Sequence, residues 1–160
     1  MDSSKRNVLI VENDAEVQNL LSELVASLGH RAMRAGRVRD ALQVVMGLNP
    51  VDLILLDLHM PGPHGQDFLG FLRKRGYRTP TIVVSAYLDR EIVLELLRMG
   101  VEAVVAKPFT RARLCEEIER VLGGKIDGAA EAKSRVQECP RCSGVVGSTD
   151  RFCGGCGTRL

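Results

Sequence analysis

The sequence predicts an α/β fold, a doubly wound parallel sheet built from five βα repeats and followed by a small cysteine-rich module. The first observation is that short runs rich in Val, Ile and Leu recur along the first two-thirds of the 160-residue chain. Such runs are typical of parallel strands that are buried on both faces. The second observation is that stretches with helical periodicity separate the runs. Right-handed crossovers would place these helices on both faces of the sheet. A pair of Cys-x-x-Cys motifs near the C-terminus is the third observation.

Each expected element follows from its own residues. The first strand covers residues 8–11, and a helix over about residues 14–28 comes next, which Gly29 is placed to end. The apolar face of this helix consists of Val17, Leu20, Leu21, Leu24, Val25 and Leu28. The later strands are expected at residues 31–35 (weak), 53–56, 81–84 and 103–106. The later helices are expected at residues 38–48 (closed by Asn49-Pro50), 65–75, 89–99 and 111–122.

A polar residue stands at the carboxyl end of four of the apolar runs. Glu12, Asp57, Ser85 and Lys107 occupy these places. In an open parallel sheet, the carboxyl ends of the strands border the crevice in which ligands bind. The two acids, the hydroxyl and the ammonium group should therefore converge on one site. Their chemistry suits a carboxylate that accepts a phosphoryl group, with a cation and a hydroxyl beside it.

These residues belong to longer segments that closely resemble the receiver domain of bacterial two-component response regulators. The matching segments are residues 8–14 (VLIVEND), 57–62 (DLHMPG), 84–86 (VSA) and 106–109 (AKPF). The resemblance covers about residues 6–122 and implies the flavodoxin-like receiver fold. One such motif alone would be weak, because an acid at the end of a strand is common in α/β proteins. Four motifs in order and at ordinary spacings are specific.

The resemblance implies a role for each matching residue. Asp57 would accept a phosphoryl group from a histidine kinase or a phosphotransfer protein, Lys107 would pair with its carboxylate, and Ser85 would hydrogen-bond a phosphoryl oxygen. The bond between Lys107 and Pro108 would be cis. Mg²⁺ would be held by Glu12, Asn13, Asp57 and the backbone carbonyl of His59. The chain would be a signalling phosphoacceptor and not an enzyme, with at most slow self-dephosphorylation.

The sequence departs from the family pattern at the metal site. The family usually has two adjacent acids after the first strand, and this chain has Glu12-Asn13, so one negative charge is missing. Asp14 is one place too late, and we interpret it as the cap of the following helix. We expect weakened Mg²⁺ binding, and a pseudo-receiver that signals without phosphate is the alternative. Val104 stands where the family has its aromatic switch residue, and His59 and Tyr87 occupy variable positions that tune dephosphorylation.

The C-terminal module carries four cysteines at a spacing suited to zinc. Cys139 and Cys142 form one knuckle, Cys153 and Cys156 the other, and together they resemble bacterial zinc ribbons. A rubredoxin-like iron site and a redox-active Cys-x-x-Cys are the weaker alternatives. The fifth cysteine, Cys115, is expected to be a buried apolar residue of the last receiver helix. The expected organisation is a receiver at residues 1–122, a flexible linker at 123–138 and a zinc ribbon at 139–160.

Composition limits the possible partners. The formal net charge is only +2, so no general attraction to nucleic acid or to a membrane is implied. No apolar stretch reaches the roughly 20 residues that span a bilayer, and no secretory signal precedes the first strand. We therefore expect a cytoplasmic regulator that passes its signal to an unknown downstream protein through the ribbon. A regulator that binds nucleic acid through the ribbon is the less favoured alternative.

Overall fold

The computed structural model describes residues 5–123, 136–138, 141–142, 145–147 and 156. The chain divides into two compact units, Met1–Gly124 and Lys125–Leu160, which are considered separately. Within the described part of the chain, no helix combines the length and the apolarity that crossing a bilayer requires.

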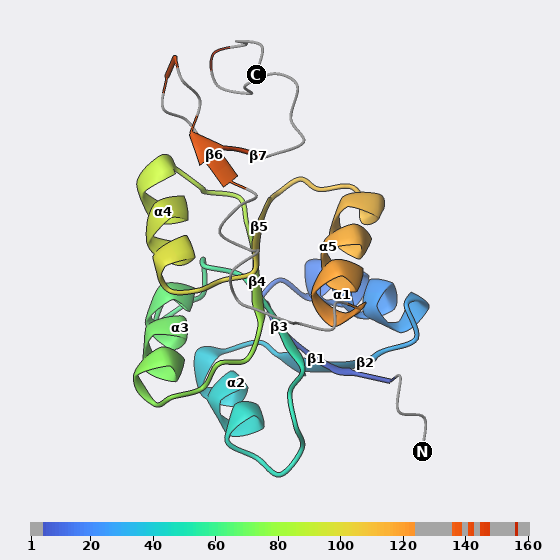
Figure 1. Cartoon of the computed structure of the whole chain (residues 1–160). Coiled ribbons are helices and arrows are strands. Elements are labelled where there is room, and N and C mark those ends of the chain that lie inside the picture. Colours follow the sequence, from blue (N-terminus) through green and yellow to red (C-terminus); the bar gives the residue numbers. More distant parts are fainter. Residues whose placement is uncertain (1–4, 124–135, 139–140, 143–144, 148–155, 157–160) are drawn as a thin grey trace. The chain divides into compact units, whose positions relative to one another are not determined.

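The first unit alternates strands and helices along the chain (Figure 1). Its strands are β1 (Asn7–Val11), β2 (Arg31–Ala35), β3 (Leu53–Leu56), β4 (Thr81–Ser85) and β5 (Ala103–Ala106). Its helices are α1 (Ala15–Ser27), α2 (Val38–Val45), α3 (Gly65–Lys74), α4 (Arg90–Arg98) and α5 (Arg111–Gly123). All strand pairs are parallel, and their order in the sheet is β2-β1-β3-β4-β5. The predicted doubly wound fold of this unit is confirmed.

The sheet separates two hydrophobic cores, because alternate residues of a strand point to opposite faces. On one face, α2, α3 and α4 pack onto the strands, and Phe68, Leu72 and Leu96 are among the buried residues there. On the other face lie α1 and α5, which contribute Leu24 and Ile118 among others (Figure 1). The central strands β1 and β3 face both cores. This double burial explains why their sequences are apolar without alternation.

Most expected elements lie within one residue of their observed bounds, and two expectations need correction. The helix expected at residues 38–48 ends at Val45, with Met46 as its C-cap. Gly47 is a poor helix former, and Leu48 beyond it packs against nothing and is fully exposed. Leu20 was expected on the buried face of α1, yet it is 37% exposed. The apolar stripe of α1 is therefore narrower than its sequence indicates.

The described part of the second unit includes two short antiparallel strands. Strand β6 (Val136–Glu138) pairs with β7 (Val145–Gly147), with Glu138 opposite Val145. The linker expected at residues 123–138 therefore overlaps with regular structure at both ends, since α5 includes Gly123 and β6 covers the last three residues. Of the four predicted zinc ligands, Cys142 and Cys156 are described, whereas Cys139 and Cys153 lie outside the described residues.

One glycine fixes how closely α3 approaches the end of β3. The Gly65 N–H donates a hydrogen bond of 3.1 Å to the Leu58 carbonyl. A Cβ atom at Gly65 would lie 2.8 Å from the Cα atom of Leu58 and 3.2 Å from the carbonyl carbon of Asp57. These atoms belong to the backbone and cannot turn away. The first residue of α3 must therefore lack a side chain for the segment after β3 to keep its course.

This close approach predicts opposite effects for two substitutions in the same helix. Gly65→Ala should lower the free energy of unfolding by about 1–3 kcal/mol, because the added methyl group forces the backbone apart. Gly70→Ala is the matched control, since a Cβ atom there meets only the Met99 methyl group at 3.6 Å. That substitution should stabilise the protein by up to about 1 kcal/mol. Urea denaturation of both variants measures the difference, and a Gly65→Ala variant as stable as the parent would contradict the packing argument.

Candidate functional site

The four polar residues singled out in the sequence come together at the carboxyl edge of the sheet. Glu12, Asp57 and Lys107 each directly follow a strand (β1, β3 and β5), and Ser85 is the last residue of β4. The strands β1, β3, β4 and β5 are consecutive in the sheet. Their ends therefore present the four side chains side by side. The predicted convergence of these residues at one edge of the sheet is confirmed.

The Lys107 ammonium group joins the two carboxylates. Its Nζ atom lies 2.7 Å from Glu12 Oε2 and 3.2 Å from Asp57 Oδ2. The carboxylate side chains are only 2% and 7% exposed, whereas the lysine side chain is 19% exposed. The sequence predicted the pair of Lys107 with Asp57, and the shorter contact with Glu12 is an additional finding. One cation thus neutralises part of the charge of two buried acids.

The pKa values of Glu12 and Lys107 follow from this arrangement. Burial raises the pKa of Glu12 and outweighs the hydrogen bonds from Lys107 and from the Asp14 N–H, which act to lower it. Burial alone would lower the pKa of Lys107, but its contacts with Glu12 and Asp57 together outweigh burial and raise it. The ammonium group is therefore charged at neutral pH, and a resident cation faces the two acids.

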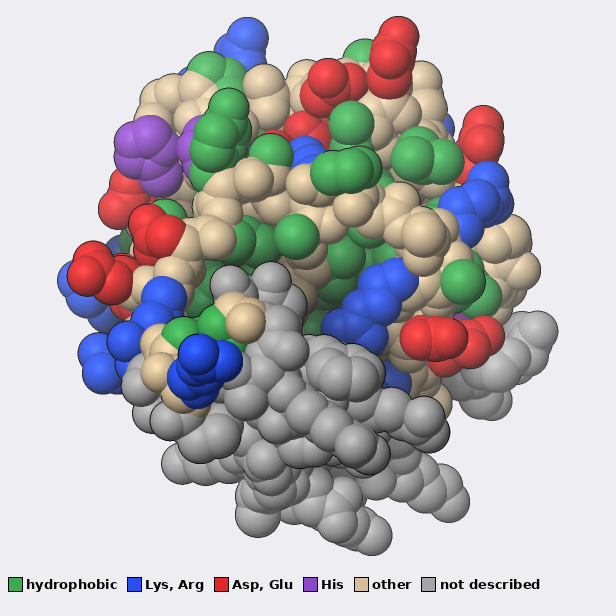
Figure 2. All heavy atoms as spheres, turned by 90° about the horizontal axis from the view of Figure 1, so that it is seen from above, with side chains coloured by type: hydrophobic (Ala, Val, Ile, Leu, Met, Phe, Trp, Pro, Cys, Tyr) green, Lys and Arg blue, Asp and Glu red, His purple; other side chains and the backbone are tan. Residues whose placement is uncertain are grey.

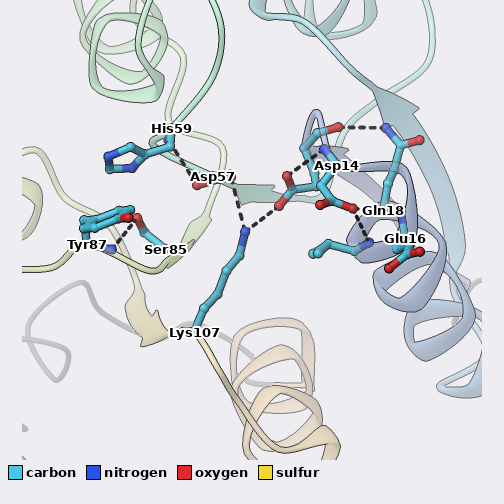
Figure 3. A network of polar contacts seen from close by, with 10 residues as sticks. Asp14, Glu16, Gln18, Asp57, His59, Ser85, Tyr87 and Lys107 are labelled. Atoms are coloured by element: carbon cyan, nitrogen blue, oxygen red, sulfur yellow. Dashed lines mark hydrogen bonds and ion pairs between the residues drawn. The ribbon is translucent and has the colours of Figure 1, made fainter.

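Both oxygens of the Asp57 carboxylate have a donor. The His59 N–H donates to Oδ1 at 3.0 Å, and Lys107 donates to Oδ2. The Asp57 N–H in turn donates to the Val11 carbonyl at 3.0 Å, which ties the residue to the neighbouring strand. The carboxylate is consequently held in one orientation at the mouth of the site (Figure 3).

The loops after β3 and β4 meet above the carboxylate. The ring centroids of His59 and Tyr87 are 4.6 Å apart, and their planes are tilted by 42°. The Tyr87 N–H donates to Ser85 Oγ at 3.4 Å, and Ser85 itself is fully buried (Figure 3). The His59 side chain is exposed. No sequence signal indicated this ring contact.

The segment after Glu12 is organised by side-chain bonds. Glu12 Oε1 accepts the Asp14 N–H at 3.0 Å, and the Asp14 carboxylate accepts the N–H groups of Glu16 and Val17 at the start of α1. The interpretation of Asp14 as a helix cap is confirmed. Gln18 donates to the Glu12 carbonyl at 3.0 Å, a contact that the sequence did not reveal. Asn13, between the two acids, is exposed.

The donor set at this edge fits a hard cation. Glu12 and Asp57 offer carboxylate oxygens, Asn13 carries an amide oxygen, and His59 has a backbone carbonyl, all of which are ligand types that Mg²⁺ accepts. Among the described residues no three His, Cys, Asp or Glu side chains gather at one place, so the protein would supply two charged ligands at most here. Figure 2 shows charges of both signs interspersed with hydrophobic side chains on this view of the molecule.

Three further features of the sequence can be compared with the structure. The Lys107–Pro108 peptide bond is cis, as predicted. Val104 is only partly buried and packs against the core on the α2–α4 face. Cys115 was expected to be buried, and it is half-buried at the edge of the other core.

Comparisons with known proteins identify the first unit. The family model described as response regulator receiver domain matches residues 8–119. The regulator of RpoS from Escherichia coli K12 is 37% identical over 103 residues, which are 64% of this chain and 30% of that protein. The glycerol metabolism activator of Pseudomonas putida is 34% identical over 98 residues, 61% of this chain and 44% of that protein. The chain thus spans less than half the length of these relatives.

A solved structure agrees with the family match. The receiver domain of the Francisella response regulator 1452 is similar with a TM-score of 0.69 and 26% sequence identity. The match covers 74% of this chain and 98% of that domain. The similarity concerns the first unit, because the receiver match ends at residue 119.

The bridging lysine predicts a charge-dependent loss of stability. Lys107→Met should lower the free energy of unfolding by about 3 kcal/mol at neutral pH in a chelator, because two buried carboxylates lose their cation. The loss should shrink as the pH falls through the raised pKa of Glu12, because a protonated Glu12 no longer needs the cation.

The control for this prediction removes one of the acids. In the background of Asp57→Asn, the same Lys107→Met substitution should cost clearly less, because only one carboxylate is left without its partner. Thermal and urea denaturation of the four proteins give the comparison. An equal cost in both backgrounds would mean that Lys107 stabilises the fold through its packing and not through its charge.

Proposed function

The chain belongs to the response regulator receiver family, and on this premise we propose that it accepts a phosphoryl group on Asp57 from a histidine kinase or a phosphotransfer protein. Receiver domains act as phosphoacceptors in two-component signal transduction and are generally not enzymes. The observation that carries the proposal for this chain is the position of the Asp57 carboxylate, held between the Lys107 ammonium group and the His59 N–H. We further propose that this takes place in the cytoplasm.

The residues around Asp57 supply orientation and charge. Phosphoryl transfer needs in-line positioning and neutralisation of charge more than covalent help from the protein. Asp57 Oδ1 and Oδ2 are each fixed by one donor, so the carboxylate has a defined face toward an incoming donor. A phosphoryl oxygen would compete with the carboxylates for Lys107, whose ammonium group has three hydrogens to donate. Lys107 could then follow the negative charge from the acceptor to the phosphoryl group.

Ser85 is suited to detect the modification. Its oxygen accepts the Tyr87 N–H and keeps its own hydrogen available for a phosphoryl oxygen. Ser85 is also the last residue of β4, so a movement of its hydroxyl passes directly into the loop before α4. Phosphorylation of Asp57 would in this way change the surface that the loop before α4 presents to a partner.

Receiver domains bind Mg²⁺ at the phosphorylation site, and this chain would hold it with Glu12, Asp57, the Asn13 amide oxygen and the His59 carbonyl. The ion supplies positive charge that offsets the negative charge of the phosphoryl group. With Lys107 counted, Glu12 and Asp57 give the site a net charge of about −1, where a second acid at position 13 would give about −2. The weaker field favours weaker metal binding.

The missing negative charge at Asn13 supports a second candidate function. If the Asn13 site fails to hold the cation at cellular concentrations, the chain would act as a pseudo-receiver scaffold that binds its partners without phosphate. The intact Asp57–Lys107 contact favours the phosphoacceptor over the scaffold, because a scaffold has no need of a buried pair that costs desolvation energy.

For the second unit, we propose a zinc ribbon that contacts a downstream protein. Four cysteines in two Cys-x-x-Cys knuckles support the proposal, and so does the antiparallel pairing of β6 with β7 around the first knuckle. In the sequence, Cys139 follows β6 directly, and two residues separate Cys142 from the start of β7. The alternative, binding of nucleic acid by the ribbon, has less support, since the sequence of the segment has no basic run and its described residues include no helix.

Phosphorylation is tested by mass spectrometry of the intact chain. Incubation with a small phosphodonor and Mg²⁺ should add one phosphoryl group, and Asp57→Asn should abolish the addition. Asp52→Asn is the matched control, because Asp52 lies before β3, where it accepts the Asn7 N–H at 2.7 Å. A phosphoryl group that is still gained at parental yield by Asp57→Asn would refute the assignment.

The charge deficit at position 13 predicts a gain of function. Asn13→Asp should tighten Mg²⁺ binding by about tenfold, since two charges about 4 Å apart interact by roughly 4 kcal/mol at an effective dielectric of 20 and desolvation offsets much of this. Calorimetric titration of both proteins with Mg²⁺ provides the affinities. Equal affinities would show that Asn13 is not what limits the metal site.

Zinc binding is tested by native mass spectrometry. The chain should carry one zinc ion, Cys139→Ser/Cys142→Ser should lose it, and Cys115→Ser should retain it as the control. Chelation should leave the melting temperature of the receiver unit unchanged, because the chain divides into two compact units and zinc would stabilise the second. Absence of zinc in the parent chain would rule out the ribbon.

A further inference from the structure

An aromatic contact crosses the mouth of the candidate site. The rings of His59 and Tyr87 belong to the loops after β3 and β4, and their centroids are 4.6 Å apart. Both side chains are exposed, and Tyr87 is exposed to 67%. The contact is therefore not imposed by burial in a core. The ring contact joins the two loops beyond the ends of β3 and β4, where the strands no longer pair (Figure 3).

Each ring is tied through its own backbone to a residue of the site. The His59 N–H donates to Asp57 Oδ1 at 3.0 Å, and the Tyr87 N–H donates to Ser85 Oγ at 3.4 Å. Asp57, His59, Tyr87 and Ser85 thus form one continuous series of contacts, from the carboxylate across the two rings to the hydroxyl. A displacement at either end would therefore act on the ring contact.

A phosphoryl group on Asp57 would act on both ends of this series. Its oxygens would compete for the donors of the carboxylate, and the buried Ser85 hydroxyl would have to turn or move toward them. Because the Tyr87 N–H is bonded to that same hydroxyl oxygen, the loop after β4 would move with it. The His59 ring, which is held beside Asp57, would not follow to the same extent, so the two rings would change their contact.

We propose that His59 and Tyr87 are positioning residues whose ring contact holds the loop between β4 and α4 in its unphosphorylated place. The inference rests on the proposed phosphorylation of Asp57 and adds the element that opposes the loop movement. Aromatic pairs stabilise the arrangement in which they meet. The ring pair therefore biases the equilibrium toward the resting loop, and a ligand at Asp57 spends part of its binding free energy on breaking the contact.

The first test uses the resting protein and needs no phosphorylation. Hydrogen exchange measured by NMR should show a loss of amide protection at Tyr87 in His59→Ala and a reciprocal loss at His59 in Tyr87→Ala, each about two- to tenfold. His59→Phe and Tyr87→Phe keep both rings and should keep the protection. Unchanged protection in both alanine variants would overturn the proposal, whether or not Asp57 is phosphorylated.

The second test measures how tightly the site binds beryllofluoride, a phosphoryl analogue, in the presence of Mg²⁺. His59→Ala and Tyr87→Ala should each increase the affinity about two- to tenfold, because the ligand no longer has to break the contact. The double alanine variant should gain no more than either single variant, since one contact is lost in all three. Additive gains, or affinities equal to the parent, would overturn the proposal.

The ring pair also provides an optical signal. The chain has two tyrosines and no tryptophan, so Tyr77→Phe leaves Tyr87 as its only tyrosine fluorophore. The fluorescence of that variant should change on addition of beryllofluoride and Mg²⁺, and Asp57→Asn should abolish the change. Phosphorylation of Asp57 without any change at Tyr87 would refute the ring pair and leave the phosphoacceptor role intact. Failure of phosphorylation together with the reciprocal loss of protection would refute that role and keep the resting contact.

Discussion

The arrangement of the site depends on one interaction, the Lys107 ammonium group between the buried carboxylates of Glu12 and Asp57. Two acids that are almost excluded from solvent repel each other, and burial already raises the pKa of Glu12. The lysine makes their proximity tolerable at neutral pH. Its position at the end of β5 in turn requires the parallel order of the sheet, because β3 and β4 lie between β1 and β5. The order of the strands and the neutralisation of the two buried acids therefore depend on each other.

The surroundings of this interaction divide into a rigid part and a responsive part. Gly65 lets α3 approach the backbone of Asp57 and Leu58, and the Asp57 N–H donates to the Val11 carbonyl. The backbone of Asp57 is therefore held in place by both neighbours. In the loop after β4, Leu88 packs against the core, but Tyr87 is held only by a long hydrogen bond to Ser85 and a ring contact with His59 among the contacts described. A signal is best transmitted through the weaker part, since local rearrangement requires contacts that can be broken at low cost.

The strands and the converging residues could be predicted from the sequence because both follow from local patterns. Double burial makes β1 and β3 apolar without interruption, and the ends of parallel strands share one edge. Features that depend on packing between distant segments were not predictable. The end of α2 at Val45, the exposure of Leu20 and the contact between His59 and Tyr87 are of this kind. The shorter bond from Lys107 to Glu12 depends on side-chain geometry, which spacing alone does not give.

We propose that Asp57 accepts the phosphoryl group and that Lys107 and Ser85 bind its oxygens. A crystal structure of the chain with beryllofluoride and Mg²⁺ is the most direct test. We expect beryllofluoride on the Asp57 carboxylate, with Lys107 Nζ and Ser85 Oγ each within hydrogen-bond distance of a fluorine atom. A structure obtained under saturating ligand in which Asp57 stays bare, or in which Lys107 keeps both its resting contacts while beryllofluoride is bound, would contradict it.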